Sequence, residues 1–335
     1  MKKILFYLTF FLFAIACTNN KTEIFPVLTG DYLGQELPQD SAILFAPGIV
    51  STGMADRDVV FCPDGSEIYF CRNIKNFKFS TIFYVKQIDG VWTEPKILEF
   101  ATNPKFIYIE PHISPNGSKL YFASNMNLEG TEPGIMNIWI SDRTENGWGE
   151  PYSIGAPINT KTDQYFPSVT TDGTMYFTSE DSTNEEFIFR SKLVDGNYQE
   201  PKKLPINING GRARFNALIS PDESFIIVPT FGLPDSYGAT DYYIVFRNEN
   251  DNWSKPINMG NQVNSKNGQE WSASISPDGK YLFLMSARIP EMELEGEVTS
   301  DIYNSLHNSP QNGLSDIYWI STNFIDDLRK QAIFK

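Results

Sequence analysis

Eight side chains that could hold a ligand stand in five short, dissimilar segments of an otherwise repetitive sequence. Three arginines offer bidentate contacts to anions, two glutamates could accept or transfer protons, and two tyrosines and a tryptophan offer stacking faces. They are Arg57, Tyr108, Glu110, Tyr165, Arg212, Arg214, Glu270 and Trp271. Structural repeats require similar residues and a site requires different ones, so this dissimilarity suggests a binding site. The alternative is a structural plug of ion pairs, such as Arg57 or Arg214 with Glu110.

Catalytic motifs are sparse. The chain has two histidines: His112 falls in a predicted strand, where we expect it to be partly buried and satisfied, and His307 falls in a polar insert. No cluster shows metal-ligand spacing, and we find no nucleophile elbow and no glycine-rich phosphate loop. We therefore expect no metal, no cofactor and a binding role. The alternative is a carbohydrate-active or peptidase-like enzyme, because paired carboxylates can cleave glycosides.

The elements that would position these residues form a repeat. Five turns of the type Ser-Pro-Asp-Gly each precede an aromatic strand, and their second positions fall at residues 63, 115, 171, 221 and 277. The spacing is 52, 56, 50 and 56 residues. Proline at i+1 and glycine at i+3 suit a type I turn, and the flanking Ile, Tyr, Phe and Val suit strands. Repeats of this length built from short strands predict a β-propeller with one blade per repeat.

The count of strands predicts how the ring closes. Each repeat continues with a third strand, and four repeats then have an aromatic-x-x-Pro segment before an outer strand (Trp92–Pro95, Trp148–Pro151, Tyr198–Pro201 and Trp253–Pro256). The last repeat lacks that segment, whereas residues 42–50 have no hairpin partner of their own. We expect these residues to supply the outer strand of the last blade, which removes an exposed edge. The prediction is an all-β, five-bladed propeller; six blades are the alternative, if residues 22–55 and 288–315 build a degenerate blade.

Propeller geometry also predicts where the eight side chains lie. In propellers the segment entering the first strand and the loop between the second and third strands lie on one face, around the axis. The eight residues belong to such entering segments, so we expect them to ring one mouth of the central channel. An anionic or sugar-like ligand suits them. The fifth loop on this face, residues 288–315, carries four glutamates between 291 and 297, and we expect a solvated flap rather than a lid.

The N-terminus reads as a targeting signal. Lys2 and Lys3 precede a short apolar run from Ile4 to Ala16, which is typical of a secretory signal and short for a membrane span. Ala14-Ile15-Ala16-Cys17 resembles a bacterial lipobox, in which Cys17 becomes the lipidated first residue; a plain cleaved signal is the alternative. We expect a signal peptide at 1–16, a tether and N-terminal extension at 17–41, and one propeller domain at 42–335.

Charge and cysteine content limit the classes of partner that we expect. The net charge is −14 and no run of basic residues occurs, so nucleic acid is a poor partner. Besides Cys17, only Cys62 and Cys71 are present, at offset positions of one hairpin, which predicts two buried thiols rather than a disulfide. We expect a monomer, held at the membrane by the lipid anchor alone, whose partner is an envelope protein or a carbohydrate or anionic small molecule.

The hairpins resemble a known family. Turns such as Ser276-Pro277-Asp278-Gly279 followed by Tyr281-Leu282-Phe283 are similar to those of TolB-like, WD-repeat-like propellers, over roughly residues 42–320. The segments Tyr32–Gln35 and Phe45–Ser51 look like those of a subgroup of lipoproteins from Bacteroidetes-type bacteria. The resemblance implies a propeller lipoprotein of the cell envelope, at the outer membrane. It says little about activity, because relatives include translocation accessory proteins and the propeller domains of prolyl peptidases.

The lipobox leads to a direct test. The Cys17→Ser variant is expected to lose lipidation and to be released from membranes, because acylation supplies the only apolar anchor once a signal is removed. Incorporation of a labelled fatty acid, followed by membrane fractionation, measures both effects. A wild-type protein that incorporates no label would show that the signal is a plain cleaved one.

Overall fold

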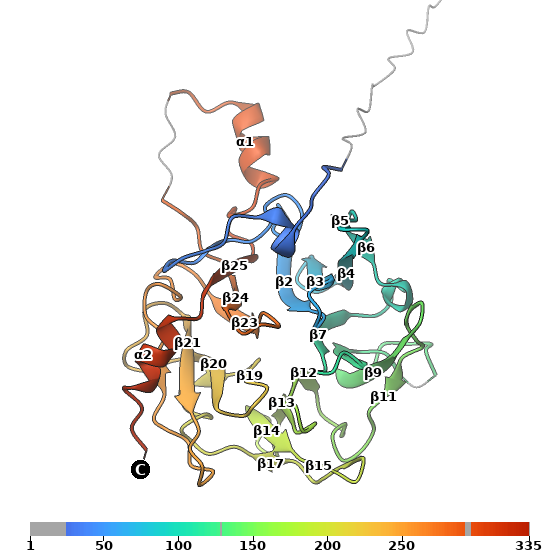
Figure 1. Cartoon of the computed structure of the whole chain (residues 1–335), viewed down its shortest axis with the longest axis vertical. Coiled ribbons are helices and arrows are strands. Elements are labelled where there is room, and N and C mark those ends of the chain that lie inside the picture. Colours follow the sequence, from blue (N-terminus) through green and yellow to red (C-terminus); the bar gives the residue numbers. More distant parts are fainter. Residues whose placement is uncertain (1–24, 128, 292–295, 335) are drawn as a thin grey trace, which may run out of the picture.

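Five antiparallel sheets follow one another around a central axis as the blades of a β-propeller (Figure 1). The computed structural model describes residues 25–127, 129–291 and 296–334. The five-bladed, all-β prediction is confirmed, and the six-bladed alternative is wrong. Its extra blade would need strands in the fifth insert, where the described residues form a helix instead.

Each blade runs from an inner strand at the axis to a short outer strand. The inner strands are β2 (Ala55–Phe61), β7 (Tyr108–Ile113), β12 (Gln164–Val169), the pair β18 (Ala213–Arg214) and β19 (Leu218–Ile219), and β23 (Glu270–Ile275). The second strands are β3 (Glu67–Ile74), β8 (Lys119–Ser124), β13 (Met175–Glu180), β20 (Phe225–Phe231) and β24 (Tyr281–Ser286). The third strands are β4 (Phe79–Ile88), β9 (Asn137–Thr144), β14 (Glu186–Ser191), β21 (Thr240–Phe246) and β25 (Asp316–Ser321).

The outer strands are two residues long, and four of them begin directly after the proline of the aromatic-x-x-Pro segment. They are β6 (Lys96–Ile97), β11 (Tyr152–Ser153), β17 (Lys202–Lys203), β22 (Ile257–Asn258) and, in the last blade, β1 (Ile43–Leu44). Short strands before them complete small hairpins: β5 (Val91–Trp92), β10 (Gly147–Trp148), and β15 (Leu193–Val194) with β16 (Asn197–Tyr198). Proline is tolerated here because the strand it introduces lies at the edge of its blade.

All five predicted turns form, including the two that depart from the motif. In each turn the amide of the fourth residue donates to the carbonyl of the first, at 2.7 to 3.0 Å. The carboxylate or amide at the third position also accepts from the backbone two residues later, as Asp64 does from Ser66 at 2.9 Å. The fourth turn has Glu223 in place of glycine, with φ 57°. Its carboxylate holds Arg190 at 3.1 Å and Arg247 at 2.6 Å, which offsets this backbone strain.

The N-terminal strand closes the ring as predicted. β1 pairs with β25, with Ile43 opposite Trp319, and the Phe45 amide donates to the Ile317 carbonyl at 2.8 Å. Phe45 is fully buried, and its ring centroid lies 5.0 Å from that of Phe283 and 5.2 Å from that of Trp319. Part of the expected tether packs as well, since Leu33 joins the same aromatic cluster. Closure therefore combines a strand pairing with an apolar core.

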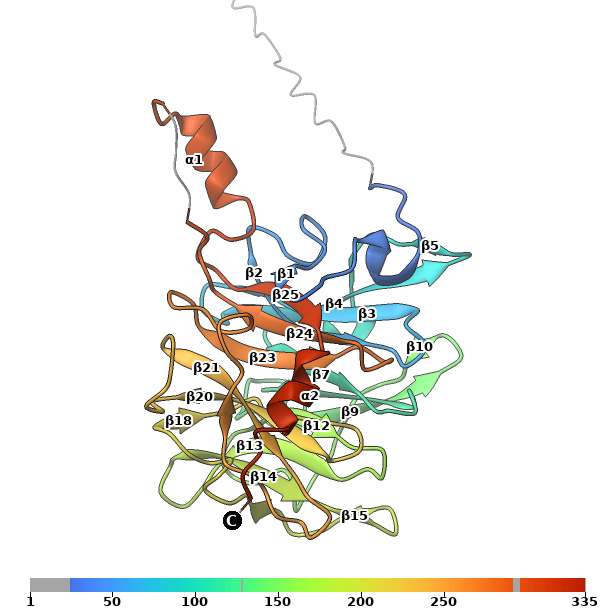
Figure 2. The same ribbon diagram turned by 60° about the vertical axis from the view of Figure 1, so that its left-hand side comes forward.

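The fifth insert projects from the ring. It contains α1 (Ser300–His307), none of whose residues is buried, and Figure 2 shows this helix standing clear of the blades. The insert is solvated, as expected, but it holds a helix that the sequence analysis did not predict; residues 292–295 lie outside the described part. A second helix, α2 (Phe324–Arg329), packs against the fourth and fifth blades through Ile325. Two short 3₁₀ turns, Asp31–Gly34 and Glu99–Ala101, complete the elements.

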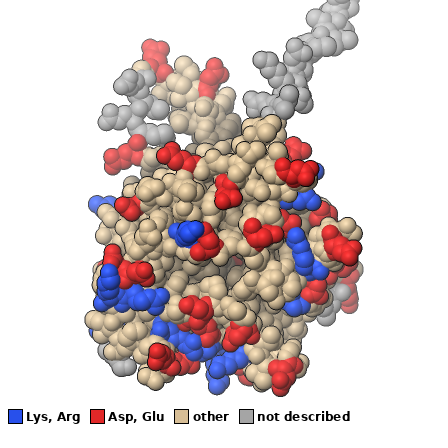
Figure 3. Space-filling model, viewed as in Figure 1, with Lys and Arg blue, Asp and Glu red and all other residues tan. Residues whose placement is uncertain are grey.

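Charges of both signs are mixed on the face seen in Figure 3. On the face seen in Figure 3, Lys and Arg side chains gather over α2 and the lower blades of the ring, with Asp and Glu side chains among them. That face offers no continuous basic surface. In the described part of the chain, no helix has the length and apolar character needed to cross a membrane.

Deletion of residues 18–50 is expected to leave β25 with an unpaired edge and to open the aromatic cluster around Trp319. We expect insolubility or a large fall in Tm. The single change Phe45→Ala, which removes the ring that fills this cluster, is expected to cost about 3–5 kcal/mol of the free energy of unfolding. Thermal melts and urea titrations measure both effects.

The matched control is deletion of residues 18–24 alone, which precede the described part of the chain. Unchanged melting in both deletions would mean that the N-terminal strand does not hold the ring closed.

Candidate functional site

An irregularity in the inner strands shapes the channel mouth. In the first, second, third and fifth blades the pairing between inner and second strand shifts by one residue; Arg57 faces Cys71, for example, but Val60 faces Tyr69. In the first three blades the first unpaired residue of the bulge has a left-handed backbone, with φ of 58° at Asp58, 58° at Glu110 and 51° at Phe166. Asn216, between β18 and β19, has φ 50°. Such bulges re-aim side chains and recur next to functional sites.

The bulges bring two consecutive residues of each inner strand to the axis, where a regular strand would bring one. The outer of the two resulting rings lines the channel mouth and consists of Arg57, Ile109, Tyr165, Phe215 and Trp271. The inner ring consists of Asp58, Glu110, Phe166, Asn216 and Ser272. Within each ring the residues follow the same 52, 56, 50 and 56 spacing as the turns, so they are equivalent positions of the repeat.

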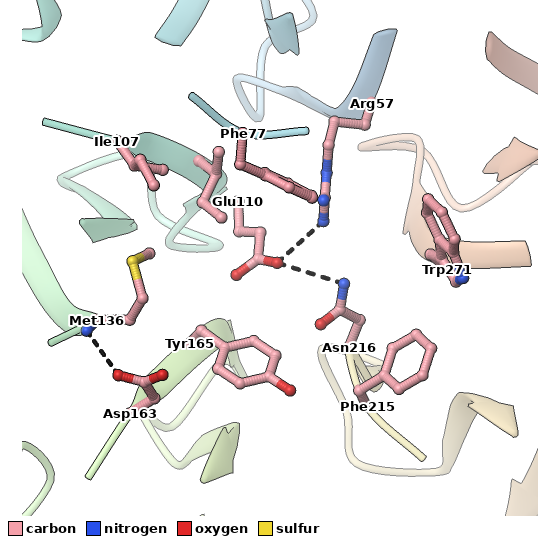
Figure 4. A pocket seen from close by; sticks show the side chains of 11 residues that line it. Arg57, Phe77, Ile107, Glu110, Met136, Asp163, Tyr165, Phe215, Asn216 and Trp271 are labelled. Carbon is pink, nitrogen blue, oxygen red and sulfur yellow. Dashed lines mark hydrogen bonds and ion pairs between the residues drawn. The ribbon is translucent and has the colours of Figure 1, made fainter. Parts of the chain in front are cut away.

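The outer ring surrounds a cavity of about 340 Å³ with largely apolar walls (Figure 4). Phe77, Ile107 and Met136 from the neighbouring loops add to its walls, and Asp163 lies at its edge, where its Oδ1 accepts from the Met136 amide at 2.9 Å. Phe77 lies at the tip of the β3–β4 hairpin and is the last of three successive residues with a left-handed backbone. Its ring lies 5.2 Å from the Arg57 guanidinium carbon. Four aromatic rings, counting Tyr165, Phe215 and Trp271, therefore border the cavity.

The floor of the cavity is a buried polar network. Arg57 donates from Nε to Asp58 Oδ2 at 2.6 Å and from Nη2 to Glu110 Oε1 at 3.0 Å. Glu110 also accepts from Asn216 Nδ2 at 3.3 Å and, through Oε2, from the Phe166 amide at 2.8 Å. Ser272 Oγ accepts from Asn216 Nδ2 at 3.2 Å and lies 3.4 Å from Arg57 Nη2. Side chains of four blades are thus joined around the axis.

Two acceptors in this network are left without a partner among the described residues. They are Asp58 Oδ1 and Asn216 Oδ1, both buried. The orientation of the Asn216 amide follows from its neighbour, because the opposite orientation would set its oxygen against the Glu110 carboxylate. In Figure 4 this oxygen faces the cavity, on the side of Tyr165. A buried acceptor without a partner is costly, so its position marks where a ligand donor would bind.

The charges of the floor are coupled. Burial raises the pKa of Glu110 to about 7, and the positive charge of Arg57 opposes this. For Arg57, burial lowers the pKa, but Asp58 and Glu110 more than offset it, so the guanidinium stays charged. Because this cation already pairs with two carboxylates, the floor carries no excess of positive charge.

Four of the eight predicted side chains line the cavity: Arg57, Glu110, Tyr165 and Trp271. The other four do not. Tyr108 is buried in the core between the first two blades, and Arg212 is exposed to solvent. Arg214 lies with its guanidinium carbon 3.9 Å from the Phe187 ring centroid and pairs with Glu185 at 3.8 Å, rather than with Glu110. Tyr108 and Arg214 each precede the outer-ring residue of their blade, and strand alternation turns them away from the axis.

Glu270 is the fourth predicted residue outside the cavity. It is fully buried, and its Oε1 accepts from Ser265 Oγ at 2.8 Å and from Ser286 Oγ at 2.9 Å. The predicted ion pair between Arg57 and Glu110 is present. Sequence reasoning missed Phe77, Ile107, Ile109, Met136, Asp163, Phe215 and Asn216. The repeat spacing was a signal for Ile109, Phe215 and Asn216, whereas for the loop residues the sequence analysis predicted only the face of the ring on which their loops lie.

The remaining candidates have structural partners. His112 Nε2 accepts from the Val169 amide at 2.9 Å, which ties the second blade to the third. Cys62 and Cys71 are free and buried, as predicted. Because of the bulge, Cys71 pairs in register with Arg57, well away from the position opposite Cys62. Cys17 lies outside the described residues, and the described residues contain no group of three His, Cys, Asp or Glu side chains arranged to hold a metal.

Comparison with known proteins gives only distant likenesses. No protein-family model and no curated protein match the chain. Among solved structures, a protein described as TolB from Agrobacterium tumefaciens is 13% identical, with a TM-score of 0.45, covering 80% of this chain and 90% of its own. A thermostable family-43 glycoside hydrolase is 14% identical, with a TM-score of 0.44, over 71% and 84% of the two chains.

A prolyl oligopeptidase B from Galerina marginata is 12% identical, with a TM-score of 0.41, over 68% of this chain and 30% of its own. The class of this protein, a five-bladed β-propeller, rests on its own strand order. These likenesses attach no activity to it.

Burial at Glu270 gives a pH-dependent prediction. Burial raises the pKa of Glu270 to about 7 from a usual value of 4.5, while Ser265 and Arg288 oppose the shift. The folded state therefore holds this proton more tightly than the unfolded state, and the free energy of unfolding falls as pH rises from about 4.5 to about 7. Glu270→Gln, which resembles the protonated acid, should remove a part of this fall on the order of 2 kcal/mol.

Urea titrations at pH 5 and pH 7.5 compare the wild type, Glu270→Gln and the exposed control Glu249→Gln. Equal pH slopes for all three proteins would contradict the assignment of the effect to Glu270.

Proposed function

We propose that the protein is a cell-envelope lipoprotein that acts as a binding module, with the channel-mouth cavity as its site for a small sugar-like ligand. The observation that carries this proposal is Asn216 Oδ1, which is buried at the floor of an aromatic-walled cavity without a partner among the described residues. The anchor at Cys17 rests on the N-terminal sequence, the outer-membrane location rests on the resemblance of the hairpins, and the monomeric state is an expectation from the sequence.

The chemistry of the cavity suits a molecule that is apolar on its faces and carries hydroxyl groups at its edge. Aromatic rings offer stacking faces for such a molecule, and a few fixed polar groups then orient it. Asn216 Oδ1 offers an acceptor. Arg57 engages Nε and Nη2, and none of the hydrogen bonds of the described residues uses its Nη1, which remains a donor. A hydroxyl group is donor and acceptor at once, so it can use both.

The charge of the floor favours hydroxyl groups over anions. Three arginines suggested an anionic ligand, but two of them do not line the cavity, and Arg57 already pairs with Asp58 and Glu110. An anion would approach two carboxylates as closely as the single guanidinium between them. A neutral ligand meets no such repulsion.

The hydrogen bonds of Glu110 favour binding over catalysis. Its pKa near 7 would suit a general acid, which must point a proton at the ligand. Both of its oxygens instead accept from the protein, Oε1 from Arg57 and Asn216 and Oε2 from the Phe166 amide. This arrangement holds a carboxylate in place as part of the floor. We therefore propose that a carbohydrate-active or peptidase-like enzyme is the less favoured alternative.

The test is titration calorimetry against a panel of soluble oligosaccharides from envelope polysaccharides. We expect the wild type to bind at least one of them without cleaving it, and Trp271→Ala to weaken binding roughly tenfold through loss of a stacking face. Because Trp271 is only partly buried at the rim, its removal should change Tm by a few degrees at most.

Arg214→Ala is the matched control. Arg214 is buried outside the cavity, so this variant should lower Tm and leave the affinity unchanged. The reverse pattern, with Trp271→Ala unstable and binding intact, would make the rings a structural plug. Binding of an envelope protein at full strength in Trp271→Ala would move the working surface to the edges of the blades.

A further inference from the structure

A second cavity, of about 210 Å³, lies at the opposite end of the channel. The inner strands begin at the first cavity and end here, at the five turns. Four turn prolines stand around it: Pro63, Pro115, Pro221 and Pro277. The volume far exceeds the space that one water molecule requires. The two cavities share no lining residue, and the polar floor around Arg57 and Glu110 lies at the first one.

The walls of the second cavity are apolar apart from one imidazole and a few serines. Val60, Ile113, Val169, Leu218 and Ile275 supply aliphatic surface, and His112 lines the cavity among them. Such a pocket, apolar with few polar groups, is the usual form of a small-molecule site.

The tautomer of His112 follows from its hydrogen bond. Nε2 accepts from the Val169 amide at 2.9 Å, so in the neutral ring the proton is on Nδ1. Burial lowers the pKa of His112 to about 4, which keeps the ring neutral near pH 7. Nδ1 has no hydrogen-bond partner in the described part of the chain. Because His112 is half-buried and lines the cavity, the Nδ1–H group is the donor that this ring can offer to a ligand there.

The equivalent positions of the other blades show that tying two blades together does not require an imidazole. These positions hold Val60, Ser168, Leu218 and Ser274. In the third blade, Ser168 Oγ accepts from the Ile219 amide at 3.1 Å, which is the same tie made by a hydroxyl group. What histidine adds at position 112 is a second polar atom, the Nδ1–H group, on the cavity side.

We propose that this cavity binds a small neutral molecule with an apolar body and one acceptor oxygen, such as a carbonyl, which accepts from His112 Nδ1. The turns around it carry the acidic side chains of Asp64, Asp222 and Asp278, so an anion is disfavoured there. The site is independent of the sugar-like site, because the two share no residue.

The experiment uses the full folded domain labelled with ¹⁵N-histidine, with cyclopentanone as the probe and cyclopentane as the matched molecule without an acceptor. We expect a saturable shift of the His112 Nδ1 resonance with cyclopentanone and a weaker effect with cyclopentane. His112→Ser keeps a hydroxyl to accept from Val169 and removes the Nδ1–H group, so it should bind cyclopentanone roughly fivefold more weakly. Trp271→Ala should bind this probe as the wild type does.

A second variant tests the proposal independently in case His112→Ser does not fold. Ile275→Phe adds volume to the cavity wall, at a half-buried position, and should also weaken the binding of cyclopentanone. No saturable shift at His112 in the wild type would overturn the proposal. So would equal affinity for the two probes, or a folded His112→Ser that binds as tightly as the wild type.

Discussion

The bulge in the inner strands is the constraint on which the channel mouth depends. A regular strand would send residues 57 and 58 to opposite faces, and only one residue per blade could face the axis. The shift of register turns both inward, so five blades supply an outer ring for walls and an inner ring for a floor. Left-handed backbone at Asp58, Glu110, Phe166 and Asn216 costs on the order of 1–3 kcal/mol each. Hydrogen bonds between blades offset part of this cost, as where Glu110 accepts from the Phe166 amide.

Such backbone strain persists only where the surrounding structure holds it in place. Two features of the blades do this: the turns at the far end of the channel and the strand that closes the ring. The turns at the far end of the channel have the same hydrogen bond in all five repeats, even where proline or glycine is missing. The ring is closed by β1, which buries Phe45 against Phe283 and Trp319. A closed ring has no free edge to relax toward, so a local distortion at one mouth cannot relax by opening the blades.

The fold could be predicted from the sequence because its signal repeats five times. The turn at Ser276 and the strand after it are informative alone, and their recurrence fixes the blade count and the missing outer strand. The site carries a weaker signal. Choosing residues by chemistry selected Arg214 and Glu270, which have functional groups but occupy the position that alternation turns away from the axis. Choosing them by position, at the spacing of the turns, would have selected Phe215 and Ile109, which have no reactive group and do line the cavity.

The side chain of Phe77 shows why position alone is also insufficient. It reaches the cavity from the tip of a hairpin, through left-handed residues at Lys75, Asn76 and Phe77, and among the described residues no other blade has three successive left-handed residues in this loop. A loop that departs from the repeat follows no period, so its direction depends on tertiary contacts, here the Arg57 guanidinium against its ring.

The same contacts bear on whether the polar floor is a plug or a site. The floor acts as a plug in that it joins four blades, with Arg57 donating from Nε to Asp58 and from Nη2 to Glu110. A plug alone, however, would satisfy its own buried groups, since a buried acceptor without a partner costs free energy. Asn216 satisfies Glu110 and Ser272 with its nitrogen and leaves its oxygen unpaired at the cavity. The hydrogen bonds to Glu110 and Ser272 therefore hold this acceptor in position before a ligand arrives, as a preorganised site requires.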